Sequence, residues 1–210
     1  MKRILIMTVA ATALAAAIAT GATPPFGEHA DVLPSMRPTE VLRPEGVPAS
    51  LGERFGVFRA AAGETDALSP TAKSALQRMA RDHQGANLDL SRRIATSARW
   101  SAWVVPANDA LCWTLVEERR GASAGCTPIV QAAAGEAYML SYGGFGLRDG
   151  RVLVSGLMPD GVRSVTVTDR SGTSVSAPVE RNAYVVESGE PARLSWTVDG
   201  AERSLELGER

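Results

Sequence analysis

The sequence predicts a mainly β (α+β) fold, with an antiparallel sandwich-like or barrel-like domain preceded by one short amphipathic helix. Two observations predict it. From residue 100 onward, short runs of alternating apolar and polar residues recur roughly every ten residues, separated by turn-forming Pro, Gly, Asn and Asp. Before residue 100, one stretch instead carries apolar residues at helical spacing. The chain of 210 residues is long enough for one domain with an appendage.

We divide the chain into four parts. Residues 1–22 are interpreted as a signal peptide and residues 23–50 as a Pro-rich linker, which we expect to be disordered. Proline fixes φ and removes a backbone donor, so the linker favours extended chain over packed elements. Residues 51–99 form a helical lead-in, and residues 100–207 form the antiparallel β domain.

The amino terminus has the layout of a secretory signal. Lys2 and Arg3 precede an uncharged stretch over residues 4–23 that ends in small residues. We expect cleavage between Ala19 and Ala22, and therefore a secreted or cell-surface protein. The alternative is an uncleaved membrane anchor, because a spanning helix needs about 17–25 residues and the uncharged stretch has that length. A membrane partner is expected only in that second case.

One helix is expected in the lead-in. Ser69 is a good N-cap, and Pro70 suits the first helical position. Apolar residues then recur at i, i+3, i+4, i+7 and i+8, namely Ala72, Ala75, Leu76, Met79 and Ala80. Gly85 is a plausible stop for this helix. Residues 86–99 are ambiguous, so we assign no element to them.

The β domain consists of short strands separated by turn signals. We expect strands at residues 100–105, 111–117, 137–142, 151–157, 164–168, 174–179, 183–187, 193–198 and 204–207. A short helix is expected within residues 127–134. Asp199 followed by Gly200 is a hairpin signal, and Pro178 places its strand at a sheet edge or at a strand end.

Cys112 and Cys126 are the only cysteines. An even number in an exported chain predicts a structural disulfide. Closing a loop of about 15 residues contributes roughly 3 kcal/mol in the chain-entropy model. The spacing is not that of a Cys-x-x-Cys redox pair. A metal site needs about four ligands, and His29 and His83 are the only histidines. We therefore expect no metal site and no cofactor, and we interpret His83 as a helix-cap or surface residue.

No catalytic set is complete in the sequence, and no residue is assigned a catalytic role. The G-x-S-x-G pattern at residues 121–125 marks a nucleophile elbow only when an acid and then a histidine follow, and no histidine follows Ser123. We expect a flexible loop of small residues there. Ser–Lys chemistry would have to use Lys73 with Ser69 or Ser74, on a helix face that the pattern leaves exposed.

Three of the four tryptophans lie close together in sequence, at Trp100, Trp103 and Trp113. One interpretation is a stacking platform for a sugar or a peptide, with Trp103 and Trp113 as the binding-surface aromatics. The other interpretation is core. Trp100 and Trp103 fall on opposite faces of a regular strand, so at most one of them is interior if one face is solvated.

The second half of the chain resembles small exported proteins of unknown function from GC-rich Gram-positive bacteria. The resemblance rests on Gly-Leu-Met-Pro-Asp-Gly-Val at residues 156–162, on the strand with Val165 and Val167, and on Asn-Ala-Tyr-Val-Val at residues 182–186. It implies no activity, and no residue inherits a role from it.

We therefore expect a non-enzymatic, exported β-rich domain that acts as an interaction or structural module at the cell surface, with a cell-surface protein or glycan as its partner. A formal net charge of −1 gives no argument for nucleic acid. Two alternatives remain open. One is an exported hydrolase whose carboxylates converge only in the fold, and the other is a membrane-tethered extracytoplasmic sensor.

Overall fold

The computed structural model describes residues 47, 49–80, 85–96, 99–117, 119–143, 145, 147 and 150–208. All of these residues belong to one compact unit. The expected signal peptide and both histidines lie outside the described residues. Among the described residues, no helix has the length and the apolar character that crossing a membrane requires.

The described strands form three open antiparallel sheets, so the sandwich-like prediction is confirmed and a closed barrel is not formed. Sheet A has the order β1-β2-β3-β4, formed by Arg92–Thr96, Ser101–Pro106, Ala110–Glu117 and Gly121–Pro128. Sheet B has the order β5-β6-β9, formed by Ala137–Tyr142, Val152–Leu157 and Ala183–Ser188. Sheet C has the order β11-β10-β7-β8, formed by Ala201–Glu206, Pro191–Val198, Ser164–Asp169 and Ser174–Pro178.

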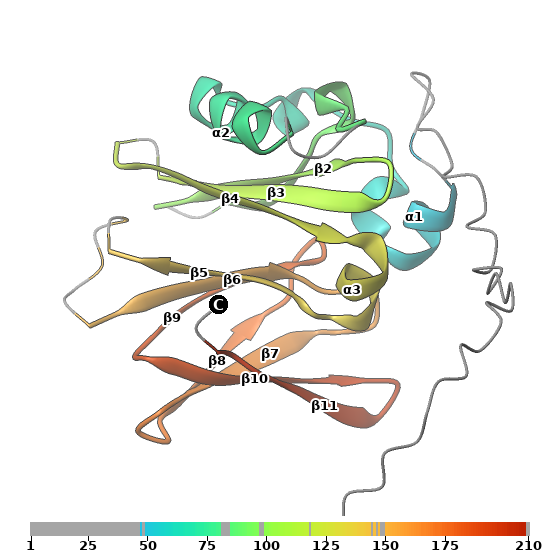
Figure 1. Cartoon of the computed structure of the whole chain (residues 1–210). Coiled ribbons are helices and arrows are strands. Elements are labelled where there is room, and N and C mark those ends of the chain that lie inside the picture. The colour runs from blue at the N-terminus through green and yellow to red at the C-terminus, as the bar shows by residue number, and fades with distance from the viewer. Residues whose placement is uncertain are drawn as a thin grey trace, which may run out of the picture. The chain divides into compact units, whose positions relative to one another are not determined.

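The sheets are stacked, with sheet B between sheets A and C (Figure 1). Apolar side chains from sheets A and B meet in one core, among them Ile94, Val104, Leu111, Trp113, Leu115, Leu153 and Leu157. Side chains from sheets B and C meet in a second core, among them Val154, Val165, Val167, Tyr184, Val186, Leu194 and Trp196. Successive residues of a strand face opposite sides, so β6 is buried at every position because it serves both cores.

Three α-helices flank the sheets in the described residues, at Ala49–Arg54 (α1), Pro70–Ala80 (α2) and Ile129–Ala134 (α3). Short 3-10 turns lie at Gly56–Phe58, Glu64–Asp66 and Leu88–Leu90.

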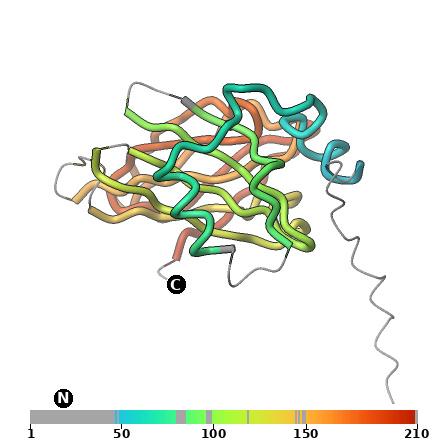
Figure 2. Tube along the Cα trace, turned by 90° about the horizontal axis from the view of Figure 1, so that it is seen from above, coloured from blue at the N-terminus to red at the C-terminus, as the bar shows by residue number. Residues whose placement is uncertain are grey.

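The predicted helix is confirmed as α2, which covers the outer face of sheet A (Figures 1 and 2). The Oγ of Ser69 accepts a hydrogen bond of 3.2 Å from the Ala72 N–H, as expected of an N-cap. Ala72 packs against Trp103, and Leu76 packs against Cys112. Sheet A is therefore covered on both faces, by α2 and by sheet B.

Two segments differ from the sequence prediction. Residues 86–99, to which no element was assigned, contain β1, whose pairing with β2 shifts register between Arg93 and Ala95. Residues 121–125, expected to be a flexible loop, belong to β4 and pair along their length with β3. Small residues have weak strand propensity by themselves, so the ladder to the buried β3 determines the structure here.

The turn and the strand end predicted among the last strands are confirmed. Asp199 and Gly200 both have positive φ, of 51° and 76°, and Val198 pairs directly with Ala201 across them. This is the geometry of a two-residue hairpin of the primed type. Pro178 is the last residue of β8, the outer strand of sheet C.

Candidate functional site

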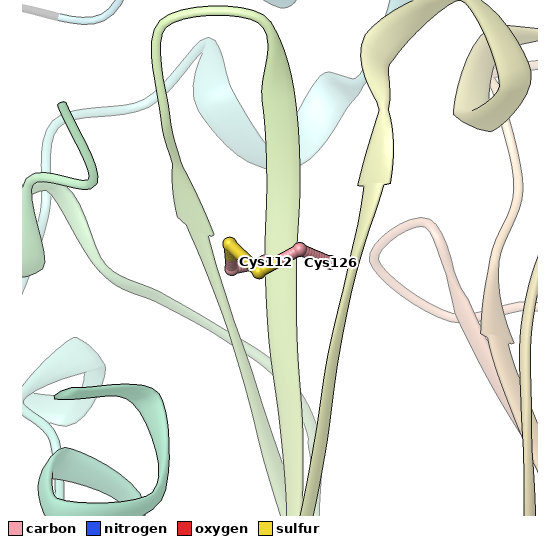
Figure 3. Close-up of a disulfide and its surroundings, with 2 residues drawn as sticks. All are labelled: Cys112 and Cys126. Carbon is pink, nitrogen blue, oxygen red and sulfur yellow. A yellow bond between two sulfur atoms is a disulfide. The ribbon is translucent and has the colours of Figure 1, made fainter. Parts of the chain in front are cut away.

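The predicted disulfide is present and joins the last two strands of sheet A (Figure 3). Cys112 of β3 lies directly opposite Cys126 of β4, and their Cα atoms are 4.0 Å apart. The pair packs beneath α2, against Leu76 and Val105. The bridge ties the outermost strand of sheet A to a strand that is buried almost throughout.

The short Cα–Cα distance at the disulfide also shows which way the backbone groups of β4 point. Directly opposed residues in an antiparallel ladder are close, about 4.5 Å apart at Cα, when they do not exchange hydrogen bonds, and about 5.5 Å apart when they do. Cys126 is therefore a non-hydrogen-bonded position. In agreement, the odd-numbered Ile129 just beyond β4 donates to the Asp109 carbonyl oxygen at 2.9 Å. The backbone groups of even-numbered β4 residues face away from β3.

These outward-facing groups form an open sheet edge. Ala122, Ala124 and Cys126 each present an N–H and a carbonyl oxygen. Pro128 adds no open group, because it has no N–H and, as the N-cap of α3, its carbonyl oxygen accepts the first hydrogen bond of that helix. Strand β4 is a terminal strand of sheet A, and the outward groups of Ala122, Ala124 and Cys126 have no hydrogen-bond partner within the described residues. An edge of this kind is a template for pairing with another strand.

Strand β4 lacks the features that usually protect an edge. It carries no charged residue, and its only proline is its last residue. Three other outer strands are protected. β1 has two arginines and an irregular register, β8 ends in a proline and lies close to β9, and β11 carries three charged residues. Strand β5, one of the two outer strands of sheet B, is also uncharged, whereas the other, β9, carries Glu187.

Strands β4 and β5 lie against each other across the two sheets. The Ser141 Oγ of β5 donates to the Ser123 Oγ of β4 at 3.0 Å. Tyr142 at the end of β5 is 59% exposed and Val130 in α3 is 75% exposed, and these are the most exposed large apolar residues of the described chain. We define the open edge as strand β4.

The two ends of β4 differ in charge. Residues 117–120 before it read Glu-Glu-Arg-Arg and have no net charge. Arg120 forms an ion pair of 3.4 Å with Glu117, and Arg119 is exposed. At the other end lie the exposed Asp109, whose carbonyl oxygen is bound by the first residue of α3, and the exposed Glu136 just after α3. The open edge thus has an exposed arginine where β4 begins and is acidic where it ends.

Trp103 and Trp113, for which the sequence left a binding surface and the core as alternatives, belong to the core. Trp103 and Trp113 are each 3% exposed. Trp103 packs in the cluster under α2, and Trp113 packs in the core between sheets A and B. The binding-surface interpretation assumed that one face of the sheet is solvated, and it is wrong because both faces are covered. Trp100 lies just outside β2 and packs against Phe145, with a ring separation of 6.1 Å.

The serines considered for catalysis have structural partners. Ser123 lies inside β4, where its carbonyl oxygen accepts from Thr114 and its hydroxyl bonds Ser141. Ser69 caps α2, and the Ser74 Oγ accepts from the Arg78 guanidinium at 2.9 Å. Within the described residues, none of these hydroxyls forms a hydrogen bond with a side chain that could act as a base, as a nucleophile–base pair requires.

A buried carboxylate joins three distant segments of the chain. Asp66 is 5% exposed and accepts hydrogen bonds from the Gly63 N–H at 2.9 Å, the Arg93 N–H at 2.8 Å and the Arg181 guanidinium at 3.1 Å. Burial raises the pKa of Asp66, but these hydrogen bonds and the charge of Arg181 outweigh burial, so the pKa lies below its usual value. Asp66 is therefore held in its ionised form.

A second polar cluster involves Asn182, in the turn between β8 and β9. Its side chain accepts from the Val57 N–H at 2.9 Å and donates to the Met158 carbonyl oxygen at 3.0 Å and to Asp160 at 2.9 Å. Arg181 and Asn182 both have positive φ, of 49° and 66°. Arg59 forms an ion pair with Asp160.

The hollow beside this cluster has a volume of about 510 Å³ and is lined by Asp160, Arg181 and Asn182 with neighbouring backbone. The carboxylates of Asp66 and Asp160 are both bound by groups of the protein. The pKa of Asp169 is lowered as well, first by the hydrogen bond from the Ser171 hydroxyl. A general acid at neutral pH needs the opposite shift, upward. Within the described residues, no group of His, Cys, Asp and Glu is arranged to hold a metal ion.

Comparison with protein-family models, with characterised proteins and with solved structures found no match for this chain. A function therefore has to be proposed from the chain's own geometry.

Proposed function

We propose that this protein is a non-enzymatic interaction module of the extracytoplasmic space, which binds an extended segment of a cell-surface protein by strand addition to β4. One observation carries the proposal. The outward N–H and carbonyl groups of Ala122, Ala124 and Cys126 lack partners within the described chain, on an outer strand without charge. Strand addition satisfies such groups through main-chain hydrogen bonds.

The disulfide supports both parts of the proposal. Disulfides persist in oxidising compartments, which fits the expected export of the chain. The Cys112–Cys126 bridge also holds β4 onto β3. An edge strand that is already in place loses little conformational freedom when a partner docks, which favours binding.

The ionisable groups give the hydrolase alternative no support. Asp66, the buried carboxylate, is ionised and is shared by Gly63, Arg93 and Arg181. It joins segments of the chain and offers no proton at neutral pH. We therefore advance the binding proposal alone.

A proline substitution on the open edge tests the proposal. In Ala124→Pro only the outward N–H is lost, so the ladder to β3 keeps its hydrogen bonds. Ala124→Ser keeps the N–H and serves as the matched control. A display library of random 12-residue peptides is selected on the wild-type domain, and bound peptides are re-tested on both variants.

We expect selected peptides to bind the wild type and Ala124→Ser equally and to bind Ala124→Pro at least tenfold more weakly. In hydrogen exchange of the peptide-free monomer, at concentrations below any self-association, the amides of Ala122, Ala124 and Cys126 exchange fast, and bound peptide protects them. Circular dichroism and thermal unfolding confirm that each variant is folded. Peptides that bind all three proteins equally, or outward amides already protected in the free monomer, would refute the proposal.

A further inference from the structure

The open edge is matched to a second copy of this chain. We propose that β4 pairs antiparallel with β4 of a second copy, so that two sheets A join into one continuous sheet about a two-fold axis at Ala124. This inference rests on the proposed function, because it names the extended segment that the edge accepts. Three features of the described residues carry it.

The first feature is the spacing of the outward groups. In an antiparallel pair centred on Ala124, Ala122 lies opposite Cys126 of the second copy, and Ala124 lies opposite its own symmetry mate. All three residues present outward N–H and carbonyl groups. Each facing pair exchanges two hydrogen bonds in such a ladder. The groups left open on one copy are therefore satisfied by the same groups on the other.

The second feature is where the ladder ends. In this register, Arg120 lies opposite Pro128 of the second copy. Pro128 has no N–H, and the Arg120 N–H already donates to the Glu117 carbonyl oxygen at 2.8 Å. A longer ladder would leave further groups unpaired, whereas a ladder from Ala122 to Cys126 leaves none unpaired between its ends. The length of the open edge thus matches the length of the self-paired strand.

The third feature is charge. Antiparallel pairing brings the exposed Arg119 at the beginning of β4 to the acidic end of the second copy, with Asp109 and Glu136. Arg119 forms no ion pair with the described residues. A parallel arrangement would place the two acidic ends together. Charge complementarity of this kind fixes register and orientation, and the two-fold axis presents it at both ends of the interface.

The exposed apolar residue near this end fits the same arrangement. Val130 is 75% exposed at the start of α3. In the proposed register the ladder ends at Pro128, so Arg119 of the second copy approaches the start of α3, where Val130 lies. The aliphatic part of an arginine covers apolar surface while its guanidinium stays in water. Val130 is then covered by Arg119 of the second copy, and the guanidinium is directed to the acidic end.

A charge-swap experiment tests the self-pairing. One variant, Arg119→Glu, is acidic at both ends of β4. The other, Asp109→Arg with Glu136→Arg, is basic at the end of β4, so that Arg119 of the second copy meets like charge. The substituted side chains are exposed, so we expect both variants to fold. Sedimentation equilibrium is measured for the wild type, for each variant alone and for an equimolar mixture, at low and at high salt.

We expect the wild type to dimerise with a concentration-dependent midpoint, each variant alone to dimerise at least tenfold more weakly, and the mixture to form heterodimers as tightly as the wild type. Ala124→Pro is expected to be monomeric, and Ala124→Ser to behave as the wild type. High salt should reduce the difference among the charge variants, because exposed charges are screened.

The outcomes separate this inference from the proposed function. A wild type that stays monomeric up to millimolar concentration, while selected peptides still require the Ala124 N–H, overturns self-pairing and leaves strand addition standing. A dimer that is insensitive to Ala124→Pro and to the charge swaps overturns self-pairing through β4. If the outward amides are protected in the monomer, both proposals fail together.

Discussion

The carboxylate of Asp66 and the guanidinium of Arg181 form an ion pair of 3.1 Å across 115 positions of sequence. Asp66 lies in the lead-in before the first strand, and Arg181 lies in the turn between β8 and β9. The neighbouring turn residue Asn182 binds the lead-in again at Val57. The lead-in and the last third of the chain are therefore joined by polar contacts as well as by the apolar cores.

The ion pair makes stability depend on acid pH. The pKa of Asp66 is lower in the folded protein than in the unfolded chain, where it is about 3.9. Protonation therefore favours the unfolded state, and the stabilisation from Asp66 is present above that value and is lost as pH falls through the folded pKa. We expect Asp66→Asn to be less stable than the wild type at pH 7 and to approach it below about pH 3. Thermal unfolding of both proteins from pH 2 to 7 measures this, and a difference independent of pH would contradict it.

Asn182 provides a test of the second polar cluster. Asn182→Gly keeps the freedom to adopt a positive φ but removes the side chain that serves Val57 and Met158. We expect a loss of about 1–3 kcal/mol, because these buried backbone groups lose their partners. Asn182→Ala adds the strain of a positive φ, about 1 kcal/mol more. Urea unfolding gives both values, and a glycine variant as stable as the wild type would contradict the assignment.

Removal of the disulfide should destabilise the domain without unfolding it. In the double variant Cys112→Ala with Cys126→Ala, we expect a loss of roughly 3 kcal/mol from the loop-closure contribution. Strand β4 should open first, because the bridge fastens it to β3. Hydrogen exchange of the amides of Ser123 and Gly125, which face β3, reports this opening. If these amides stay as protected as those of β6, the bridge does not hold the edge.

Alanine substitutions at two glycines with similar φ distinguish the cost of backbone strain from the cost of side-chain crowding. Gly135 and Gly172 have φ of 83° and 87°. A Cβ on Gly135 would lie 2.8 Å from the Trp196 ring, whereas one on Gly172 would meet nothing within 4 Å. We expect Gly172→Ala to lose about 1 kcal/mol from strain alone and Gly135→Ala to lose more. Calorimetry of both variants checks this order, and equal losses would show that the Trp196 ring yields.

The sequence was most informative where pattern and local chemistry agree. The Asp199–Gly200 hairpin, the Ser69 cap and the Cys112–Cys126 pair each depend on few neighbouring residues, and each is found as predicted. The fold class follows from such elements, because short strands joined by tight turns form antiparallel sheets.

The parts that were missed depend on contacts distant in sequence. Trp103 and Trp113 were considered as surface residues because the local alternation of apolar and polar residues does not show what covers a sheet. Sheet A is covered by α2 on one face and by sheet B on the other. The small residues of β4 resemble a loop, and only their ladder to β3 makes them a strand. The open edge is a relationship between strands, so no residue type marks it. The Asp66–Arg181 pair spans most of the chain and leaves no local pattern.

The strand order of sheet B means that this sheet is completed late during synthesis of the chain. Strand β6 ends at Leu157, but its second neighbour, β9, begins only at Ala183, after β7 and β8 of sheet C. A growing chain that has emerged only as far as Leu157 has β6 with one side unpaired and one face without its core. The middle layer is completed only when Ser188 has emerged, and the chain then needs only the β10–β11 hairpin. During synthesis, the unpaired side and the uncovered face of β6 therefore stay exposed, and open to aggregation, while some thirty further residues are added. This takes roughly 2–6 s at ordinary synthesis rates.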